Sequence, residues 1–307
     1  MKYGLLLITV VFLLFCTVEP RAYSETKESG SYEMTSPDSV HNGYEENSVD
    51  HPSGKDTGIQ PASDMKIVED IREIEFHEIK YGQESPEYYG FIKGRIPVLI
   101  SAPHGTRHFR RRWKHWKGED EYTSSLAIEL GRLTGAFVIY VKNKTREDPN
   151  NDPRSRYKTA VAKAVKEYHI KFLLDLHGSD EDRPYKIDIG ILSGKTRKSS
   201  CPTFKKVITE AVSDFEPKLF NKRFCANDAC TMTSFAKNEL GIEAAQVEVN
   251  AKYRIVERKP DSSRARRGIE PHFKANPKDV LDLVTKLEQM VYEINLKIEE
   301  GNGVQPE

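Results

Sequence analysis

The segment Ile-Ser-Ala-Pro-His-Gly-Thr at residues 100–106, together with Leu-Leu-Asp-Leu-His-Gly at residues 173–178, decides the predicted fold. Each segment is an apolar run that stops at a histidine followed by a glycine. Continuous apolar runs bounded by turn residues are typical of strands that are covered on both faces. In open α/β sheets, ligands bind beyond the carboxyl ends of the strands, so His104 and His177 are predicted to meet there.

Around these two segments, predicted strands alternate with predicted helices. Apolar patterns indicate strands at residues 95–100, 136–141, 171–176, 185–192 and 242–249, and helices at residues 119–133, 155–168, 202–215, 231–240 and 277–299. Residues 67–81 and 87–92 alternate apolar with polar side chains, which predicts an opening β-hairpin or edge pair. This order predicts an α/β fold with a mixed, largely parallel sheet flanked by helices, in a single domain.

The ends of the chain differ in composition from this region. Residues 1–24 combine Lys2 with an apolar run and a small-residue exit, which is typical of a signal peptide; an uncleaved anchor is the alternative. Residues 25–64 are acidic and poor in aliphatic side chains, so a disordered linker is expected. Residues 65–300 form the predicted domain, and residues 301–307 a flexible tail. We therefore expect a secreted or periplasmic protein that is free of the membrane after signal cleavage.

Charge and cysteine content narrow the function classes. The 307 residues include 47 basic and 47 acidic side chains, so no net field draws the chain to nucleic acid or membranes, and neither is an expected partner. Three cysteines follow the predicted signal peptide: Cys201, Cys225 and Cys230. Cys225 and Cys230 could close a small disulfide loop, and the odd number leaves one thiol over. None belongs to a Cys-x-x-Cys pair, so we do not expect them to bind metal.

An acidic run lies between the two histidine segments. Histidine is the commonest biological zinc ligand, and a catalytic zinc takes two or three histidines, commonly with a carboxylate. Either Glu119 or Asp120 could complete a His–carboxylate–His site that leaves a fourth position for water; Asp120 is preferred and Glu119 stays open. The alternatives are two unrelated loop histidines and acids that only stabilise the start of the predicted helix.

A third acid, Glu248, interrupts an apolar predicted strand close to its carboxyl end. A carboxylate in such a place is costly unless it is paired, exposed or functional. As a general base, Glu248 could take a proton from the attacking water and pass it to a leaving amine. The alternative is an ordinary salt-bridged strand residue.

Four short motifs together resemble a known family. Pro-His-Gly at 103–105, Glu-Asp at 119–120, Asp-Leu-His-Gly at 175–178 and Gln-Val-Glu-Val-Asn at 246–250 resemble, in order and rough separation, the signature of the N-formylglutamate amidohydrolases. The resemblance covers residues 95–254. It implies a fold similar to zinc carboxypeptidases and aspartoacylase-like deacylases (the phosphorylase/hydrolase-like class), with one Zn²⁺ at the strand ends.

The resemblance also implies roles for individual residues. His104 and His177 would match the histidine ligands of the zinc, Asp120 or Glu119 the acidic ligand, and Glu248 the catalytic base. Asp175, two residues before His177, is a plausible partner for an imidazole N–H behind the ligands. The implied reaction is hydrolysis of an amide bond by a water that the metal activates.

The sequence departs from the family where the substrate carboxylate is held. The family's Asp-Leu-Asn-Arg run is replaced by residues 146–154 in a different frame, and the arginine expected after Asn250 is missing. Asn150, Arg154 and Arg254 are the remaining candidates for this task, which suits the fork of an arginine. We therefore expect a small-molecule or peptide-like substrate that can carry a carboxylate, without predicting formylglutamate itself.

Residues 107–117 pack six Lys or Arg side chains and two tryptophans directly after the first predicted ligand. Such a loop could form a basic rim for an anionic substrate, could bind an anionic polymer or nucleic acid, or could simply be solvated. The sequence thus predicts a secreted zinc-dependent amidohydrolase. The alternative is a catalytically inactive binding module of the same fold that recognises an anionic polymer through residues 107–117.

Overall fold

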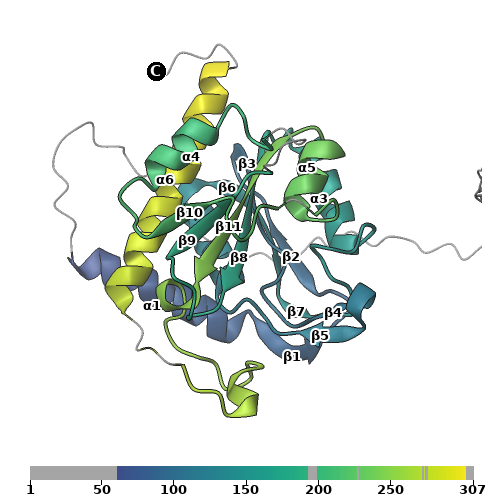
Figure 1. The fold of residues 1–307 in the computed structure, drawn as a ribbon, viewed down its shortest axis with the longest axis vertical. Helices are drawn as coiled ribbons and strands as arrows, with labels where there is room; N and C mark the ends of the chain where they lie inside the picture. Colours follow the sequence, from purple (N-terminus) through teal and green to yellow (C-terminus); the bar gives the residue numbers. More distant parts are fainter. Residues whose placement is uncertain (1–60, 193–198, 227, 272, 274–275, 302–307) are drawn as a thin grey trace, which may run out of the picture. The chain divides into compact units, whose positions relative to one another are not determined.

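A mixed sheet forms the centre of the computed structural model, which describes residues 61–192, 199–226, 228–271, 273 and 276–301. Within these residues the sheet has seven strands, in the order β10 (Lys218–Phe220), β9 (Ile187–Gly190), β11 (Glu243–Asn250), β8 (Phe172–Ser179), β3 (Ile96–Ala102), β6 (Ala136–Val141) and β2 (Tyr89–Ile92) (Figure 1). Strands β11, β8, β3 and β6 are parallel, whereas β9 and β2 run antiparallel to β11 and β6. The predicted mixed, largely parallel α/β sheet is confirmed.

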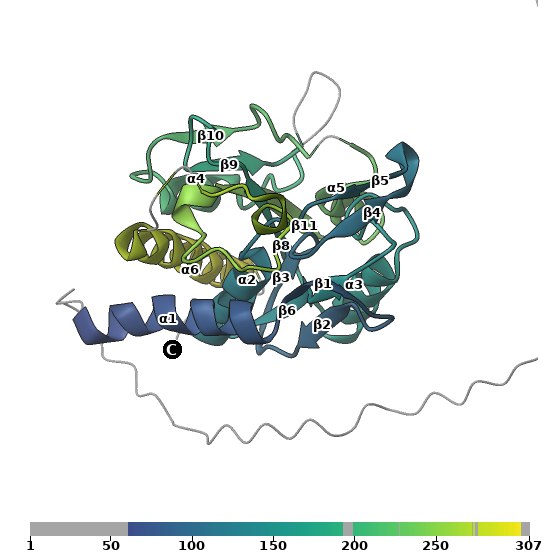
Figure 2. The same cartoon turned by 90° about the horizontal axis from the view of Figure 1, so that it is seen from below.

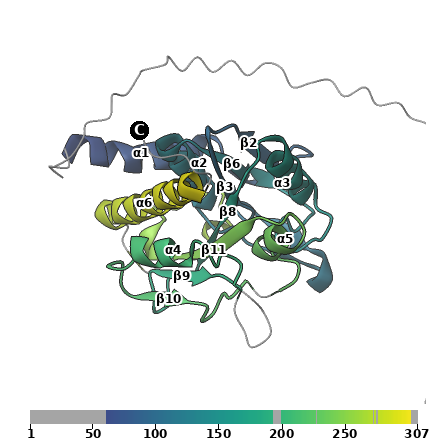
Figure 3. The ribbon, with the colours of Figure 1, turned by 90° about the horizontal axis from the view of Figure 1, so that it is seen from above.

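Helices cover both faces of this sheet. Helices α1 (Pro61–His77), α2 (Thr123–Thr134), α4 (Lys205–Ala211) and α6 (Pro277–Gly301) pack on one face, and α3 (Arg156–Glu167) and α5 (Met232–Asn238) on the other (Figures 1 and 3). The apolar stripe of α6 includes Leu283, Leu287 and Ile294, all fully buried. Burying each such side chain contributes about 1.5–3 kcal/mol, so α6 anchors the first face.

The face under α3 and α5 changes from apolar to polar along the strands. Alternate residues of a strand share a face, so Leu173 of β8 is followed there by Asp175 and His177. On the neighbouring strand β11, Gln246 pairs with Asp175 and Glu248 pairs with His177. The period of two therefore builds a buried polar floor at the carboxyl ends of the parallel strands. Since β8 extends to Ser179, His177 lies inside the strand rather than in a loop beyond it.

Smaller elements surround this end of the sheet. They are β1 (Lys80–Glu84), which pairs with β7 (Asn143–Lys144); β4 (His108–Arg110) and β5 (His115–Lys117), joined by η1 (Arg111–Trp113); and the turns η2 (Ala251–Tyr253) and η3 (Ala265–Arg267). Residues 107–117 thus form an antiparallel β-hairpin, called the basic hairpin below. Figure 1 shows it beside β1 and β7, and Figure 2 shows it extending outward.

The predicted opening hairpin of residues 67–92 is wrong. Residues 61–77 form α1, and β1 and β2 pair with β7 and β6 instead of with each other. The buried side of α1 consists of Val68, Ile71 and Glu75, spaced by three and four residues. Because Glu75 is acidic, the apolar stripe of the helix is interrupted in the sequence. The apolar residues on either side of Glu75 then alternate with polar ones, which is the pattern of a strand.

Other predicted elements exist with shifted ends. The helix expected from residue 119 begins at Thr123, so the acidic run precedes it, and the helix expected at 202–215 is limited to α4. Cys201, Cys225 and Cys230 are free thiols, so the suggested Cys225–Cys230 disulfide is absent from the described residues.

The predicted segments at the two ends of the chain fall largely beyond the structure. The signal peptide at residues 1–24, residues 25–60 of the linker and residues 302–307 of the tail lie outside the described residues. Helix α1 begins at Pro61, within the last part of the predicted linker. Among the described helices, none is long and apolar enough to cross a membrane.

Candidate metal centre and active site

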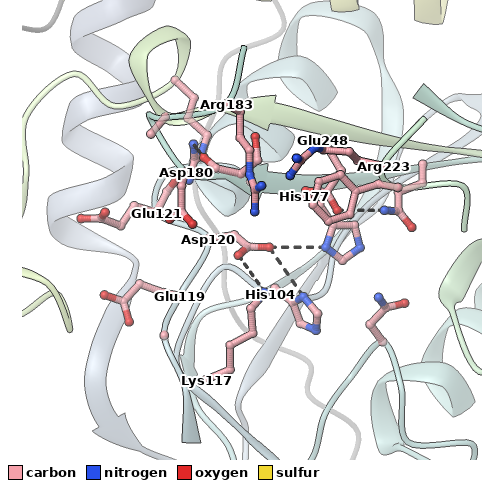
Figure 4. Close-up of a pocket in the computed structure, with 18 of the residues that line it drawn as sticks. His104, Lys117, Glu119, Asp120, Glu121, His177, Asp180, Arg183, Arg223 and Glu248 are labelled. Atoms are coloured by element: carbon pink, nitrogen blue, oxygen red, sulfur yellow. Dashed lines mark hydrogen bonds and ion pairs between the residues drawn. The ribbon is translucent and has the colours of Figure 1, made fainter. Parts of the chain in front are cut away.

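Three buried side chains converge at the carboxyl ends of β3 and β8. His104 follows β3, His177 belongs to β8, and Asp120 lies just before α2. Oδ2 of Asp120 lies 3.6 Å from Nδ1 of His104 and 3.4 Å from Nδ1 of His177, and Figure 4 shows the carboxylate between the two rings. The backbone N–H of Asp120 donates to the carbonyl of His104 at 2.9 Å, which ties the two segments together. The three donor atoms all lie within 4.8 Å of one another.

A second carboxylate orients each imidazole from behind. Nε2 of His104 lies 2.9 Å from Asp148, and Nε2 of His177 lies 3.1 Å from Asp175. Asp175 is itself held by Ser101, whose hydroxyl donates to it at 3.0 Å. Because a carboxylate engages each Nε2, each ring presents Nδ1 to the centre. This is the arrangement that fixes the tautomer and the direction of metal-ligating histidines.

The donor set fits a divalent metal. Among the described residues, Nδ1 of His104 is buried and has no hydrogen-bond partner. A buried polar atom left unpaired costs about 1–3 kcal/mol, so its presence at the convergence point indicates a ligand to be bound there. Two imidazole nitrogens and one carboxylate oxygen are ligands of the kind that zinc takes in catalytic sites.

A neighbouring group of three, His104, His108 and Asp148, supports this centre rather than forming a second one. The rings of His104 and His108 stack at 4.0 Å with 5° between their planes. Asp148 already engages His104, accepts from the backbone of Asn151 at 3.1 Å and forms an ion pair with Arg110, whose Nε lies 3.3 Å from its Oδ2. Burial, then the charge of His104, holds the pKa of His108 well below its ordinary value, so its ring stays neutral.

The electrostatics of the centre favour positive charge at its middle. Burial alone would lower the pKa of His177, but Asp175 and Asp120 raise it to about 10. Burial would raise the pKa of Asp120, but Lys117, His104 and His177 hold it well below its ordinary value. Lys117 of the basic hairpin lies 3.2 Å from Oδ1 of Asp120. The protein therefore keeps Asp120 ionised and stabilises a cation beside it.

Glu248 lies next to His177 in the sheet and lines the same cleft. Its Oε1 accepts a hydrogen bond from the amide of Gln246 at 2.9 Å. Burial raises the pKa of Glu248 to about 7, although the charge of His177 opposes the shift. A carboxylate that exchanges a proton near neutral pH, beside a candidate metal centre, has the properties of a general base.

The cleft above the centre has a volume of about 710 Å³ and is rich in charge. Several of its arginines are paired with carboxylates: Arg258 lies 3.1 Å from Glu121, and Arg264 lies 2.9 Å from Glu181. Arg183 and Arg223 also line the cleft, and within the described residues neither has a carboxylate partner. Nε of Arg183 is buried without a hydrogen-bond partner. These two cations are available to a ligand in the cleft.

The fold resembles that of N-formylglutamate amidohydrolase. The structure of that enzyme from Ralstonia eutropha matches with a TM-score of 0.45 and 12% identity, over 70% of this chain and 99% of that one. A metallo-carboxypeptidase from Burkholderia cenocepacia matches with a TM-score of 0.40 and 13% identity, over 76% of this chain and 68% of that one. A bacteriophage poly-γ-glutamate hydrolase matches with a TM-score of 0.38 and 14% identity, over 73% of this chain and 94% of that one. No family profile and no curated protein sequence matches the chain. We therefore take the function from the side chains of the site.

The structure distinguishes between the two acids that the sequence left open. Asp120 reaches both histidines, whereas Glu119 points away from them in Figure 4 and accepts a hydrogen bond from the backbone of Ser263. Burial raises the pKa of Glu119.

The three candidates for substrate binding have different surroundings. Arg254 is buried, and among the described residues its guanidinium donates only to the backbone carbonyls of Glu121, Ser179 and Val249. It braces the wall of the cleft. Asn150 lines the cleft, and its side-chain oxygen accepts from the backbone of Met232 at 2.6 Å. Arg154 is exposed and lines a separate surface pocket, so the structure does not bring it to the cleft.

The sequence motifs did not predict a role for Asp148, which orients His104. Asp148 lies in the segment 146–154, where the resemblance pointed only to Asn150 and Arg154. The signal was topological: β6 lies beside β3 in the sheet, so the segment that follows β6 is brought near the segment that follows β3. An acid after β6, such as Asp148, can therefore reach a histidine after β3, such as His104.

Proposed function

We propose that this protein is a secreted zinc-dependent hydrolase that cleaves an amide bond in an N-acyl amino acid or a peptide-like substrate. The observation that carries the proposal is the convergence of Nδ1 of His104, Nδ1 of His177 and Oδ2 of Asp120, with Glu248 beside them in one cleft. Secretion rests on the composition of residues 1–24. His104, Asp120 and His177 would hold the metal.

A zinc ion bound there would polarise the scissile carbonyl and make an adjacent water more acidic. Glu248 accepts the proton of that water as it attacks and then delivers the proton to the leaving nitrogen. Asp148 and Asp175 hold the two imidazoles in the tautomer that presents Nδ1 to the centre. Gln246 keeps the Glu248 carboxylate in place through its amide.

The free cations of the cleft select the substrate. Arg183 and Arg223 line it without carboxylate partners among the described residues, so they can bind a carboxylate on the substrate. A guanidinium binds a carboxylate through two parallel hydrogen bonds, which fixes the orientation of the substrate as well as its affinity. The expected substrates are therefore N-acyl amino acids or peptides that carry a free carboxylate.

The test combines metal content with hydrolysis of a panel of N-acyl amino acids and short peptides. We expect one zinc per chain and hydrolysis of at least one class. Glu248→Gln should lower the turnover number by about 10²–10⁴-fold while the zinc content stays at one per chain. Glu243→Gln, on the same strand but outside the cleft, is the matched control and should keep full turnover.

Two results would contradict the proposal. A folded protein without stoichiometric metal would exclude the metal centre, and an unchanged turnover in Glu248→Gln would exclude the base. If the wild type binds an anionic polymer but hydrolyses nothing in the panel, the catalytically inactive binding module is the better description.

A further inference from the structure

A second, smaller pocket opens between the basic hairpin and the turn η3. It has a volume of about 210 Å³ and is lined by Arg107, Trp116, Gly118, Ser263, Arg266 and Arg267. Gly118, Ser263 and Arg267 also line the main cleft, so the two cavities adjoin. We call this cavity the side pocket.

The side pocket gathers three guanidinium groups and no carboxylate. Among the described residues, none of Arg107, Arg266 and Arg267 has a carboxylate oxygen within 4.0 Å of its nitrogens. Arg267 donates through Nε to the backbone carbonyl of Ser263 at 3.0 Å, which leaves the end of its guanidinium for another acceptor. Three positive charges around one small cavity repel one another, and an anion between them removes that repulsion.

Local packing holds two of these cations in place. The guanidinium of Arg107 lies over the ring of Trp116 with its carbon 5.5 Å from the ring centroid. Arg266 packs against β1 at Gly82, where an added Cβ would lie 2.8 Å from Nη1 of the arginine. A guanidinium that is already oriented loses less rotamer entropy when it binds its ligand.

The surroundings of Trp116 favour a peptide over a nucleic acid. Its ring carries the guanidinium of Arg107, and the ammonium of Lys144 lies 4.3 Å from its centroid. Phe109 packs against the same ring at 5.4 Å in an edge-to-face arrangement. Single-stranded nucleic acids are bound by aromatic rings with a free face on which bases stack, and this ring is occupied by cations. It serves here to orient charge.

We propose that the side pocket binds a carboxylate of an acidic peptide whose chain extends from the main cleft. The inference rests on the proposed function, since it names the class of substrate that the same cleft would take. A carboxylate side chain fits the size of the pocket, and the shared wall of Gly118, Ser263 and Arg267 lets one ligand occupy both cavities.

The experiment measures binding of α-linked hexaglutamate and of hexaglutamine to the full-length protein by calorimetry. The wild type should bind hexaglutamate and not hexaglutamine. Arg107→Gln and Arg266→Gln, which change residues outside the main cleft, should each weaken binding about threefold to tenfold, and the double variant more than either. Arg112→Gln, in the basic hairpin but outside the side pocket, and Lys206→Gln, on the surface of α4, should change the affinity less than about twofold.

Several outcomes would overturn the inference. Wild-type affinity in the Arg107/Arg266 double variant would exclude the side pocket, and an equal loss in Arg112→Gln would show attraction by surface charge alone. Tighter binding of oligothymidylate than of hexaglutamate, with loss in Arg107→Gln, would assign the pocket to nucleic acid. Because binding requires no turnover, an enzyme that hydrolyses N-acyl amino acids but ignores hexaglutamate would refute this inference and leave the proposed function standing.

Discussion

Three cations of the main cleft and the cations of the side pocket differ in what surrounds them, whereas Arg183 and Arg223 of the cleft are unpaired within the described residues. Lys117, Arg258 and Arg264 of the cleft are each paired with a carboxylate within 3.2 Å. The guanidiniums of Arg107 and Arg266 have no carboxylate partner within the described residues. A paired cation stabilises the site that contains it, whereas an unpaired one is available to a ligand. The pairing of a charge, more than its presence in a cavity, therefore separates structural from binding residues.

The largest effect is expected at the candidate metal centre. His177→Ala removes one of the two imidazoles that would bind the metal and leaves Asp175 and Asp120 without their shared partner. Metal binding should be lost, and hydrolysis should fall by about 10³-fold or more because the metal supplies several kcal/mol of transition-state stabilisation. Metal analysis of the purified variant beside its turnover number checks this. A fully active, metal-loaded variant would exclude His177 as a ligand.

The next largest effect tests a paired cation of the cleft. Glu121→Ala leaves Arg258 buried without its partner, since both side chains are 5% exposed. Removing one member of a buried pair costs about 3–5 kcal/mol, and chemical unfolding should show a loss in this range. The double variant Glu121→Ala/Arg258→Met should recover part of the loss, because the stranded charge is gone. A loss below about 1 kcal/mol in Glu121→Ala would place this pair among ordinary surface ion pairs.

A smaller effect is expected behind the centre. Asp148→Asn replaces the carboxylate that engages Nε2 of His104 by an amide that still fills the space. Loss of such a partner typically weakens metal binding about 10–100-fold. Competition with a chelator measures the affinity, and Asp282→Asn, on the exposed side of α6, is the control. Unchanged affinity in Asp148→Asn would show that the stacked ring of His108 and the backbone suffice to orient His104.

The sheet and the candidate metal centre could be predicted from the sequence because simple patterns encode them. Apolar runs that end in His-Gly gave β3 and β8, and the rule that ligands bind at strand ends placed His104 and His177 together. The sequence favoured Asp120 but left Glu119 open, since both residues lie in one loop before Thr123 and the path of that loop decides which side chain faces the histidines. The same holds for Asp148, whose role depends on neighbouring strands distant in sequence.

The first helix shows the opposite case, in which a buried acidic side chain misled the prediction. Glu75 occupies the inner side of α1, is fully buried and accepts hydrogen bonds from the hydroxyl of Ser125 and the backbone of Tyr122. A carboxylate at that position is indistinguishable in sequence from a solvated one, so the helical stripe seemed to break there. The buried Glu75 is tolerated because Ser125 of α2 and Tyr122, just before α2, donate hydrogen bonds to it.

Glu75 also gives a testable pH dependence. Burial, opposed by the bond from Ser125, raises its pKa from 4.5 to about 8, so the folded protein holds a proton that the unfolded chain releases. The contribution to stability is full below pH 4.5 and is lost as the pH rises to about 8. Glu75→Gln should flatten the fall in unfolding free energy over this window, whereas exposed Glu73→Gln on the same helix should keep the wild-type slope. An identical slope in wild type and Glu75→Gln would show that Glu75 does not titrate there.

The smallest expected effect is the difference in salt dependence between peptide binding at the side pocket and turnover in the cleft. Arg266 is exposed, so its attraction for an anion is screened, whereas the Arg258–Glu121 ion pair of the cleft is buried and screened much less. Raising the salt from about 0.05 M to about 0.2 M should weaken hexaglutamate binding about threefold to tenfold. Over the same range, the turnover number on an uncharged N-acyl amino acid amide should change less than about twofold. If the hexaglutamate affinity and the turnover number fall together, the side pocket and the cleft respond to salt as one electrostatic surface. The pairing of Lys117, Arg258 and Arg264 would then not distinguish them from the cations of the side pocket.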